Sequence, residues 1–133
     1  MNTKHRFLLA IALLAIGSHA WAQQQCSAAF LNNKMVVNEY TTKGKCILSQ
    51  QASGKLTVCT ANLSPKSSTP VDKIAFQISI RDGKTKSLCS FSKQTYQQID
   101  IQKILAKCKK GDFIVLRALG SQYALPHNEI LVN

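Results

Sequence analysis

The chain is poor in the residues that most hydrolytic enzymes and metal sites need. Its 133 residues contain three histidines and six acidic side chains, and His127 is the only histidine beyond residue 22. Hydrolysis by a nucleophile needs a base beside a Ser, Thr or Cys, and two-histidine ribonuclease chemistry needs a second histidine. We interpret His127, which follows a proline near an expected strand end, as a surface or capping residue, and we expect no enzymatic activity.

The carboxylates are too scattered to act as a catalytic pair. A glycosidase needs two that converge on one bond, whereas four of the six stand at expected turns or helix starts: Asp72, Asp82, Asp100 and Asp112. The sequence has no Gly-rich phosphate loop and no nucleophile elbow. It also lacks a Cys-x-x-Cys pair, so a zinc site would lack its usual spacing. We therefore expect no metal and no cofactor.

Only one long apolar run occurs, from Phe7 to Ile16, and it is roughly half as long as a bilayer span. Lys4 and Arg6 precede this run, and Ala20-Trp21-Ala22 follows it with the small residues that signal peptidase recognises. This pattern predicts a secretory signal peptide over residues 1–22 and no membrane anchor.

The short signal with its brief basic start is typical of bacterial export, which predicts a periplasmic or secreted protein. Lipidation is not expected, because Gln23 to Gln25 stands before Cys26, where a lipoprotein needs a small residue. The remaining residues, 23–133, are too few for two independent cores and predict a single disulfide-containing globular domain.

The mature chain is strongly basic. Without the signal it keeps fifteen basic and six acidic side chains, a net charge of +9. Such an excess concentrates anionic partners and helps solubility. The candidates are lipid headgroups, acidic glycans, nucleic acid or an acidic protein surface. Aromatic side chains are few and not interleaved with the lysines, which disfavours single-stranded nucleic acid.

Five cysteines in an exported domain indicate disulfides. Two extended segments, Lys45 to Gln50 and Lys55 to Thr60, flank four residues that suit a hairpin loop. Antiparallel pairing of these segments would place Cys46 directly opposite Cys59. We predict a Cys46–Cys59 bridge on that basis.

A second hairpin is indicated downstream. Apolar residues alternate with small or polar ones from Ile74 to Ile80, which predicts a strand with one buried face. Asp82-Gly83 suits a type I′ turn, and Lys84 to Ser92 would return as the partner strand. In that register Cys89 faces Phe76 and lies on the buried side.

One helix is predicted over about residues 98–110. Apolar residues recur at helical spacing from Ile101 to Cys108, with Asp100 placed to cap the start and Gly111 to end the segment. The helix would pack on the sheet.

The predicted helix also suggests how the remaining cysteines pair. Cys108 would point inward toward the buried face that carries Cys89, which predicts a Cys89–Cys108 bridge. Cys26 is then left as a free thiol near the start of the mature chain, although other connectivities stay open.

The last third of the chain predicts closing strands over residues 112–118, 122–125 and 129–132. The fold class is therefore α+β and mostly β. It would be either a small antiparallel sheet or a partly open OB-like barrel, with the helix at one end.

The predicted helix carries the one cluster with binding potential. Lys103, Lys107 and Lys110 lie at i, i+4 and i+7 opposite the apolar stripe, and Lys109 sits beside them. This face can hold phosphates or carboxylates, or it can be a solvated surface whose lysines complement the helix dipole. The loop from Asn62 to Asp72 and exposed strand edges are the other candidate surfaces.

Two functional hypotheses follow. The first is an exported, non-catalytic binding protein that acts on an anionic surface, a host component or a protein partner, the last as an inhibitor or immunity factor. The alternative is an oligomer-forming subunit of a secretion assembly or a toxin's binding ring, so the oligomeric state is left open.

Overall fold

The computed structural model describes residues 24–64 and 67–133, so the predicted signal peptide lies outside the described residues. The strands and the helix follow one another along the chain as β1 (Gln25–Leu31), β2 (Lys34–Met35), β3 (Ile47–Leu48), β4 (Lys55–Asn62), β5 (Thr69–Ile74), β6 (Phe76–Arg81), β7 (Leu88–Ser90), β8 (Ile99–Asp100), α2 (Ile101–Leu105), β9 (Phe113–Ala118), β10 (Tyr123–Ala124) and β11 (Glu129–Val132).

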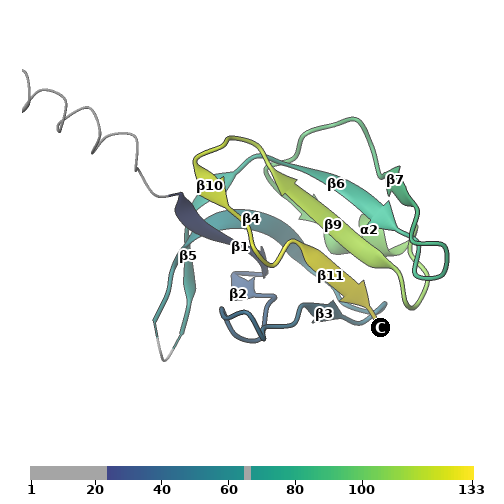
Figure 1. Cartoon of the computed structure of the whole chain (residues 1–133), viewed down its shortest axis with the longest axis horizontal. Helices are drawn as coiled ribbons and strands as arrows, with labels where there is room; N and C mark the ends of the chain where they lie inside the picture. The colour runs from purple at the N-terminus through teal and green to yellow at the C-terminus, as the bar shows by residue number, and fades with distance from the viewer. Residues whose placement is uncertain (1–23, 65–66) are drawn as a thin grey trace, which may run out of the picture.

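The strands form two sheets rather than a closed barrel (Figure 1). The first has the order β10-β1-β4-β5, with β2 paired to β1 and β8 paired to β4. The second has the order β3-β11-β9-β6-β7. The pairs β1–β10 and β3–β11 are parallel, and the other strand pairs are antiparallel. The broader expectation of a mostly β fold with one helix is confirmed.

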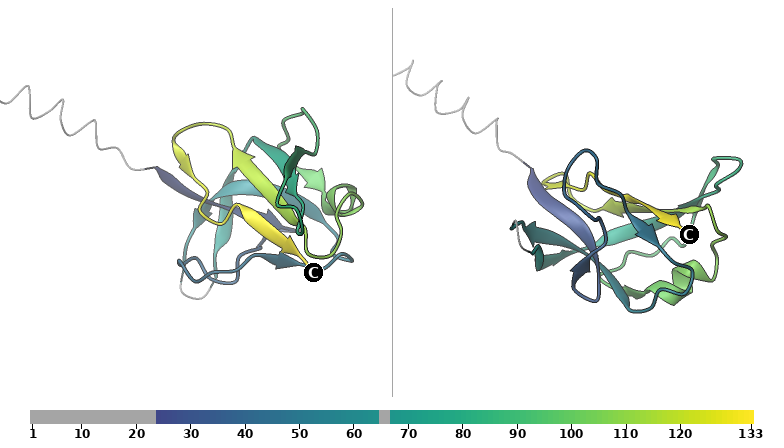
Figure 2. Two further views of the ribbon diagram at one scale, coloured as in Figure 1. Left: turned by 45° about the vertical axis from the view of Figure 1, so that its right-hand side comes forward. Right: turned by 90° about the horizontal axis from the view of Figure 1, so that it is seen from below.

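The core lies between the two sheets and the helix, which covers one side of them (Figure 2). The alternation predicted over Ile74 to Ile80 is confirmed at Ile74, Phe76 and Ile78, which are all buried. The other fully buried large side chains of this core come from β4, β9, β11 and α2: Leu56, Val58, Ile114, Leu116, Ile130, Val132, Ile101 and Ile104.

The helix is much shorter than predicted. Asp100 caps it as expected, because its carboxylate accepts a hydrogen bond from the backbone N–H of Gln102 at 3.0 Å. The helix ends at Leu105, however, and Ile99–Asp100 is a strand that pairs with β4. The N–H of Lys109 bonds to the carboxylate of Asp112 rather than to a helical carbonyl. The predicted helical face over residues 98–110 is therefore not formed.

The first predicted hairpin does not form. β3 pairs with β11, and β4 pairs with β1 and β5, so the two halves of the expected hairpin have other partners. Cys46 joins the main core, whereas Cys59 lies on the opposite face of β4 with Ala28 and Phe30. The structure therefore does not pair Cys46 with Cys59.

The second hairpin forms with a different register. Cys89 faces Ile80 rather than Phe76, and six residues, Asp82 to Ser87, connect the strands in place of a two-residue turn. Lys86 takes up the left-handed conformation (φ 65°) that the type I′ prediction required at Asp82-Gly83. A shift of four residues keeps Cys89 on the same face of the sheet but moves it past the core, where it is exposed.

The structure pairs none of the five cysteines, so the Cys89–Cys108 bridge and the single free thiol at Cys26 stay predictions. Cys26 and Cys89 are exposed, and the other three cysteines are buried. Burial raises the pKa of the Cys46 and Cys108 thiols to about 11. Both therefore stay protonated at neutral pH.

Candidate functional site

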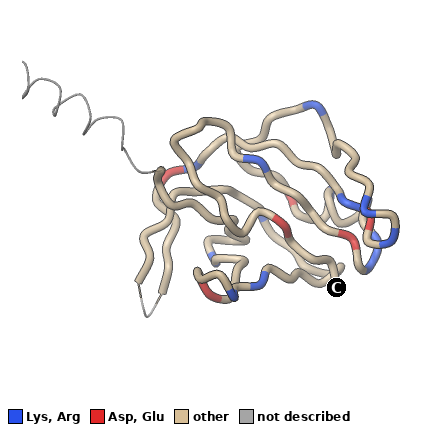
Figure 3. The backbone as a smooth tube through the Cα atoms, in the orientation of Figure 1, with Lys and Arg blue, Asp and Glu red and all other residues tan. Residues whose placement is uncertain are grey.

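Two segments far apart in the sequence meet at one end of the molecule. They are the loop from Asp82 to Ser87, between β6 and β7, and the turn from Lys107 to Asp112, which leads into β9. Figure 3 shows basic residues gathered there. We call their lysines the basic end: Lys84, Lys86, Lys107, Lys109 and Lys110.

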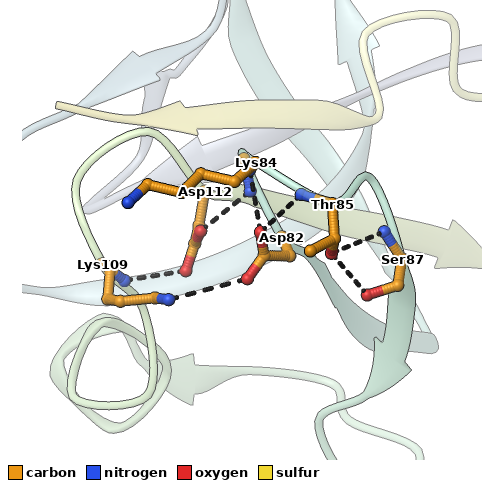
Figure 4. A network of polar contacts seen from close by, with 7 residues as sticks. Asp82, Lys84, Thr85, Ser87, Lys109 and Asp112 are labelled. Carbon is orange, nitrogen blue, oxygen red and sulfur yellow. Dashed lines mark hydrogen bonds and ion pairs between the residues drawn. The ribbon is translucent and has the colours of Figure 1, made fainter.

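Asp112 joins the two segments. Its carboxylate accepts a hydrogen bond from the backbone N–H of Gly83 at 3.0 Å and another from the N–H of Lys109 at 2.8 Å (Figure 4). The residue is only 5% exposed. A buried carboxylate that receives two N–H donors is well satisfied and fixes the position of both donors.

Asp82 shapes the loop itself. One of its carboxylate oxygens accepts the backbone N–H groups of Lys84 and Thr85 at 2.8 and 2.9 Å, and the other lies 3.6 Å from the ammonium of Lys109. The N–H groups of Thr85 and Lys84 lower the pKa of Asp82 to about 2. The carboxylate is thus ionised at neutral pH and organises both lysine-bearing segments.

A glycine contact brings the segments closer than other residues would allow. A Cβ atom added at Gly83 would lie 2.2 Å from the carbonyl oxygen of Gly111. Gly111 has a positive φ of 97°, which favours glycine there as well. Both glycines were visible in the sequence, but only the fold shows that they touch.

The lysine ammonium groups remain available to a partner. Lys107 lies over the ring of Phe91, 4.8 Å from its centroid, and Lys86 lies 5.9 Å from the centroid of Phe113. Cation–π contacts at such exposed positions are worth only about 0.5–1 kcal/mol. Within residues 24–64 and 67–133, the ion pairs are Lys109 with Asp82 and Arg81 with Glu129. Lys109 is thus the one member of the basic end with a carboxylate neighbour.

A notch of about 320 Å³ opens between the two segments and β7. Lys107 and Lys109 line it together with the carboxylates of Asp82 and Asp112, so the two signs of charge balance inside the notch. Cys89 also lines the notch. The excess of positive charge therefore lies on the lysines around the notch rather than within it.

The structure brings together three of the four predicted lysines, Lys107, Lys109 and Lys110. They lie on a turn rather than on a helical face, because α2 ends before them. Lys103 lies on α2, outside the two segments. Sequence reasoning missed Lys84 and Lys86, whose place beside the turn depends on the contacts of Asp112 and Asp82.

A larger groove of about 1100 Å³ lies elsewhere, beside the other candidate surface, the loop from Asn62 to Asp72. Met35, Tyr40 and Leu63 are among its lining residues. Its charged lining residues, Lys34 and Glu39, have opposite signs. The groove therefore lacks the concentration of one charge that distinguishes the basic end.

His127 makes contacts that connect two segments of the fold. Its Nε2 lies 2.7 Å from the carbonyl oxygen of Thr41, and its ring meets the ring of Tyr40 edge to face with centroids 5.1 Å apart. Nδ1 is buried without a hydrogen-bond partner among the described residues. The ring ties the chain before β3 to the chain before β11.

The described residues contain neither a candidate metal site nor a candidate membrane-spanning helix. No group of three or more His, Cys, Asp or Glu side chains could hold a metal ion. No helix there is long and apolar enough to cross a membrane.

No family model, no curated protein and no solved structure matches this chain.

Proposed function

We propose that this is an exported bacterial binding protein without catalytic activity, which recognises an anionic partner through the basic end. The observation that carries the proposal is the clamping of two lysine-bearing segments by Asp112 and Asp82. Lysines that serve only solubility would not need carboxylates to hold their segments in place. Export, and hence a periplasmic or secreted location, is inferred from the signal sequence. The partly open, OB-like barrel that the sequence suggested is likewise kept as a proposal.

The charge balance supports this choice of surface. The five lysines stand close to two carboxylates, Asp82 and Asp112, so the cluster keeps a net charge of about +3. Exposed charges are screened over about 8 Å at physiological ionic strength, so lysines on two joined segments attract a partner more strongly than scattered ones.

The test compares two triple charge reversals that change the net charge equally. The first replaces Lys84, Lys107 and Lys110 by Glu, and the matched control replaces Lys34, Lys45 and Lys55, which are exposed outside the basic end. Each exported protein is used to capture partners from envelope and culture fractions at low and high salt. We expect the first variant to lose capture and the control to retain it.

Equal loss in both variants would mean that net charge alone drives binding and would overturn the proposed site. Capture that is independent of salt would also contradict it, because exposed charges are screened. Sedimentation of the unmodified protein tests the oligomeric alternative. A monomer supports the binding protein, whereas a monodisperse ring would favour a subunit of an assembly.

A further inference from the structure

An exposed apolar side chain follows the loop that carries Lys84 and Lys86, and it lines a hollow with Lys93 and Arg117 rather than the notch of Lys107 and Lys109. Leu88 directly follows the Asp82–Ser87 loop, pairs with Arg81 across the β6–β7 ladder, and is 53% exposed. The other strongly exposed large apolar residues of the described chain are Ile47, Leu63 and Val71. They lie on β3, in the chain that follows β4, and on β5, and thus outside the segments that carry the basic end.

The chemistry of the basic end disfavours nucleic acid as the partner. All five cations are lysines, which act as mobile point charges, whereas arginine gives the planar fork that reads phosphates and bases in fixed geometry. The nearby Arg81 is engaged with Glu129 at 3.0 Å. The neighbouring rings of Phe91 and Phe113 are only partly exposed, which limits the surface they offer to stacking bases.

We propose that the basic end docks on an anionic lipid bilayer surface. The lysines would contact the phosphate headgroups, and Leu88 would enter the boundary between headgroups and acyl chains. Lysine clusters next to an apolar side chain are the usual means by which a protein without a lipid anchor binds such a surface. This inference rests on the proposed function, because it names the class of anion that the same site takes.

Docking through the basic end would define the orientation of the molecule relative to the membrane. The loop, the turn and β7, which begins with Leu88, lie at one end of the view in Figure 1, and β5 lies at the other. Docking through the basic end would therefore leave β5 pointing away from the lipid. Val71 on β5, which is 61% exposed, serves as the matched control position for Leu88.

Tryptophan reports the contact directly. Trp21 is the only tryptophan of the chain and belongs to the expected signal peptide, so the exported protein should have none. We would express the full chain as Leu88→Trp or Val71→Trp, purify the exported protein and check its mass. The probes are vesicles of phosphatidylcholine alone and of phosphatidylcholine with an equal part of phosphatidylglycerol.

We expect the fluorescence of Leu88→Trp to shift to the blue with the anionic vesicles only, and to be quenched by brominated acyl chains. Val71→Trp should show neither change. Replacing Lys84 and Lys110 by Gln should weaken vesicle binding by about fivefold for each lysine. The same replacement at Lys45 and Lys55 should leave binding within about twofold, since these side chains lie outside the docking end.

Vesicle binding with an unchanged Leu88→Trp spectrum, or an equal shift at Val71→Trp, would overturn this docking mode. An absence of vesicle binding would also overturn it. If the basic end then still captures an acidic protein or a nucleic acid, the proposed function survives without the lipid. If the reversal of Lys84, Lys107 and Lys110 has no effect on any capture, both proposals fail.

Discussion

The two ends of strand β6 are held by different forces. At its start, Phe76 is fully buried, exchanges two backbone hydrogen bonds of 2.8 Å with Tyr96, and packs near the ring of that residue. At its other end, the chain is held by the carboxylates of Asp82 and Asp112. Apolar burial stabilises the whole fold, whereas the carboxylates position two surface segments. The fold and the candidate binding surface should therefore respond to different substitutions.

The largest effect is expected at the apolar end. Phe76→Ala removes a fully buried ring and should lower the free energy of unfolding by about 3–5 kcal/mol. Chemical denaturation measures this change. Leu88→Ala, on the neighbouring β7, is the control and should change stability by less than about 0.5 kcal/mol, because Leu88 is exposed. A loss below about 1 kcal/mol for Phe76→Ala would show that apolar burial does not dominate there.

A smaller effect is expected from Asp112→Ala. The substitution leaves the N–H groups of Gly83 and Lys109 without their acceptor, which should cost about 1–3 kcal/mol. Amide exchange should increase at these two positions more than in β6. The exposed Asp72→Ala serves as the control. Unchanged exchange at Gly83 would contradict the role of Asp112 as the link between the segments.

The acid dependence of the loop is a third test. The pKa of Asp82 is lowered to about 2, so the ionised carboxylate is favoured in the folded loop. Its contribution should be complete above the ordinary carboxyl pKa of about 4 and be lost as the pH falls through about 2. The amide signals of Lys84 and Thr85 in NMR spectra should titrate with a midpoint near 2. Asp82→Asn should abolish this titration, and a midpoint near 4 would contradict the prediction.

The smallest effect on folding is expected from the lysines. Lys84→Glu and Lys110→Glu should each change the free energy of unfolding by less than about 0.5 kcal/mol, because both side chains are exposed. Thermal unfolding of the single variants measures this. A loss of several kcal/mol would mean that the basic end supports the fold rather than binding.

Local patterns in the sequence predicted local structure well. The alternation around Phe76 and Ile78 identified a buried strand face, and the position of Asp100 identified the helix cap. Lys107, Lys109 and Lys110 do lie together, but on a turn rather than on the predicted helical face, and Lys103 lies apart on α2. Each of these features depends on residues within a few positions of one another.

Features that depend on distant residues were missed. The register of β7 is an exception with a local cause: Asp82 accepts the N–H groups of Lys84 and Thr85 and Lys86 adopts a positive φ, so the loop has six residues in place of two. The hairpin expected around Cys46 and Cys59 failed because β1 and β11, which lie far away in the sequence, pair with its two halves. The contact between Asp112 and Gly83 likewise spans 29 residues. No spacing rule reveals such pairs.

The position of β11 in its sheet determines when β3 can pair during folding. This strand lies between β3 and β9, and its Leu131 pairs with Ile47, which is 84 residues earlier in the chain. β3 therefore has no neighbour in its sheet until Glu129–Val132 has been synthesised. Long-range pairings of this kind form late and slowly. The second sheet is thus completed only when the last strand of the described residues joins it.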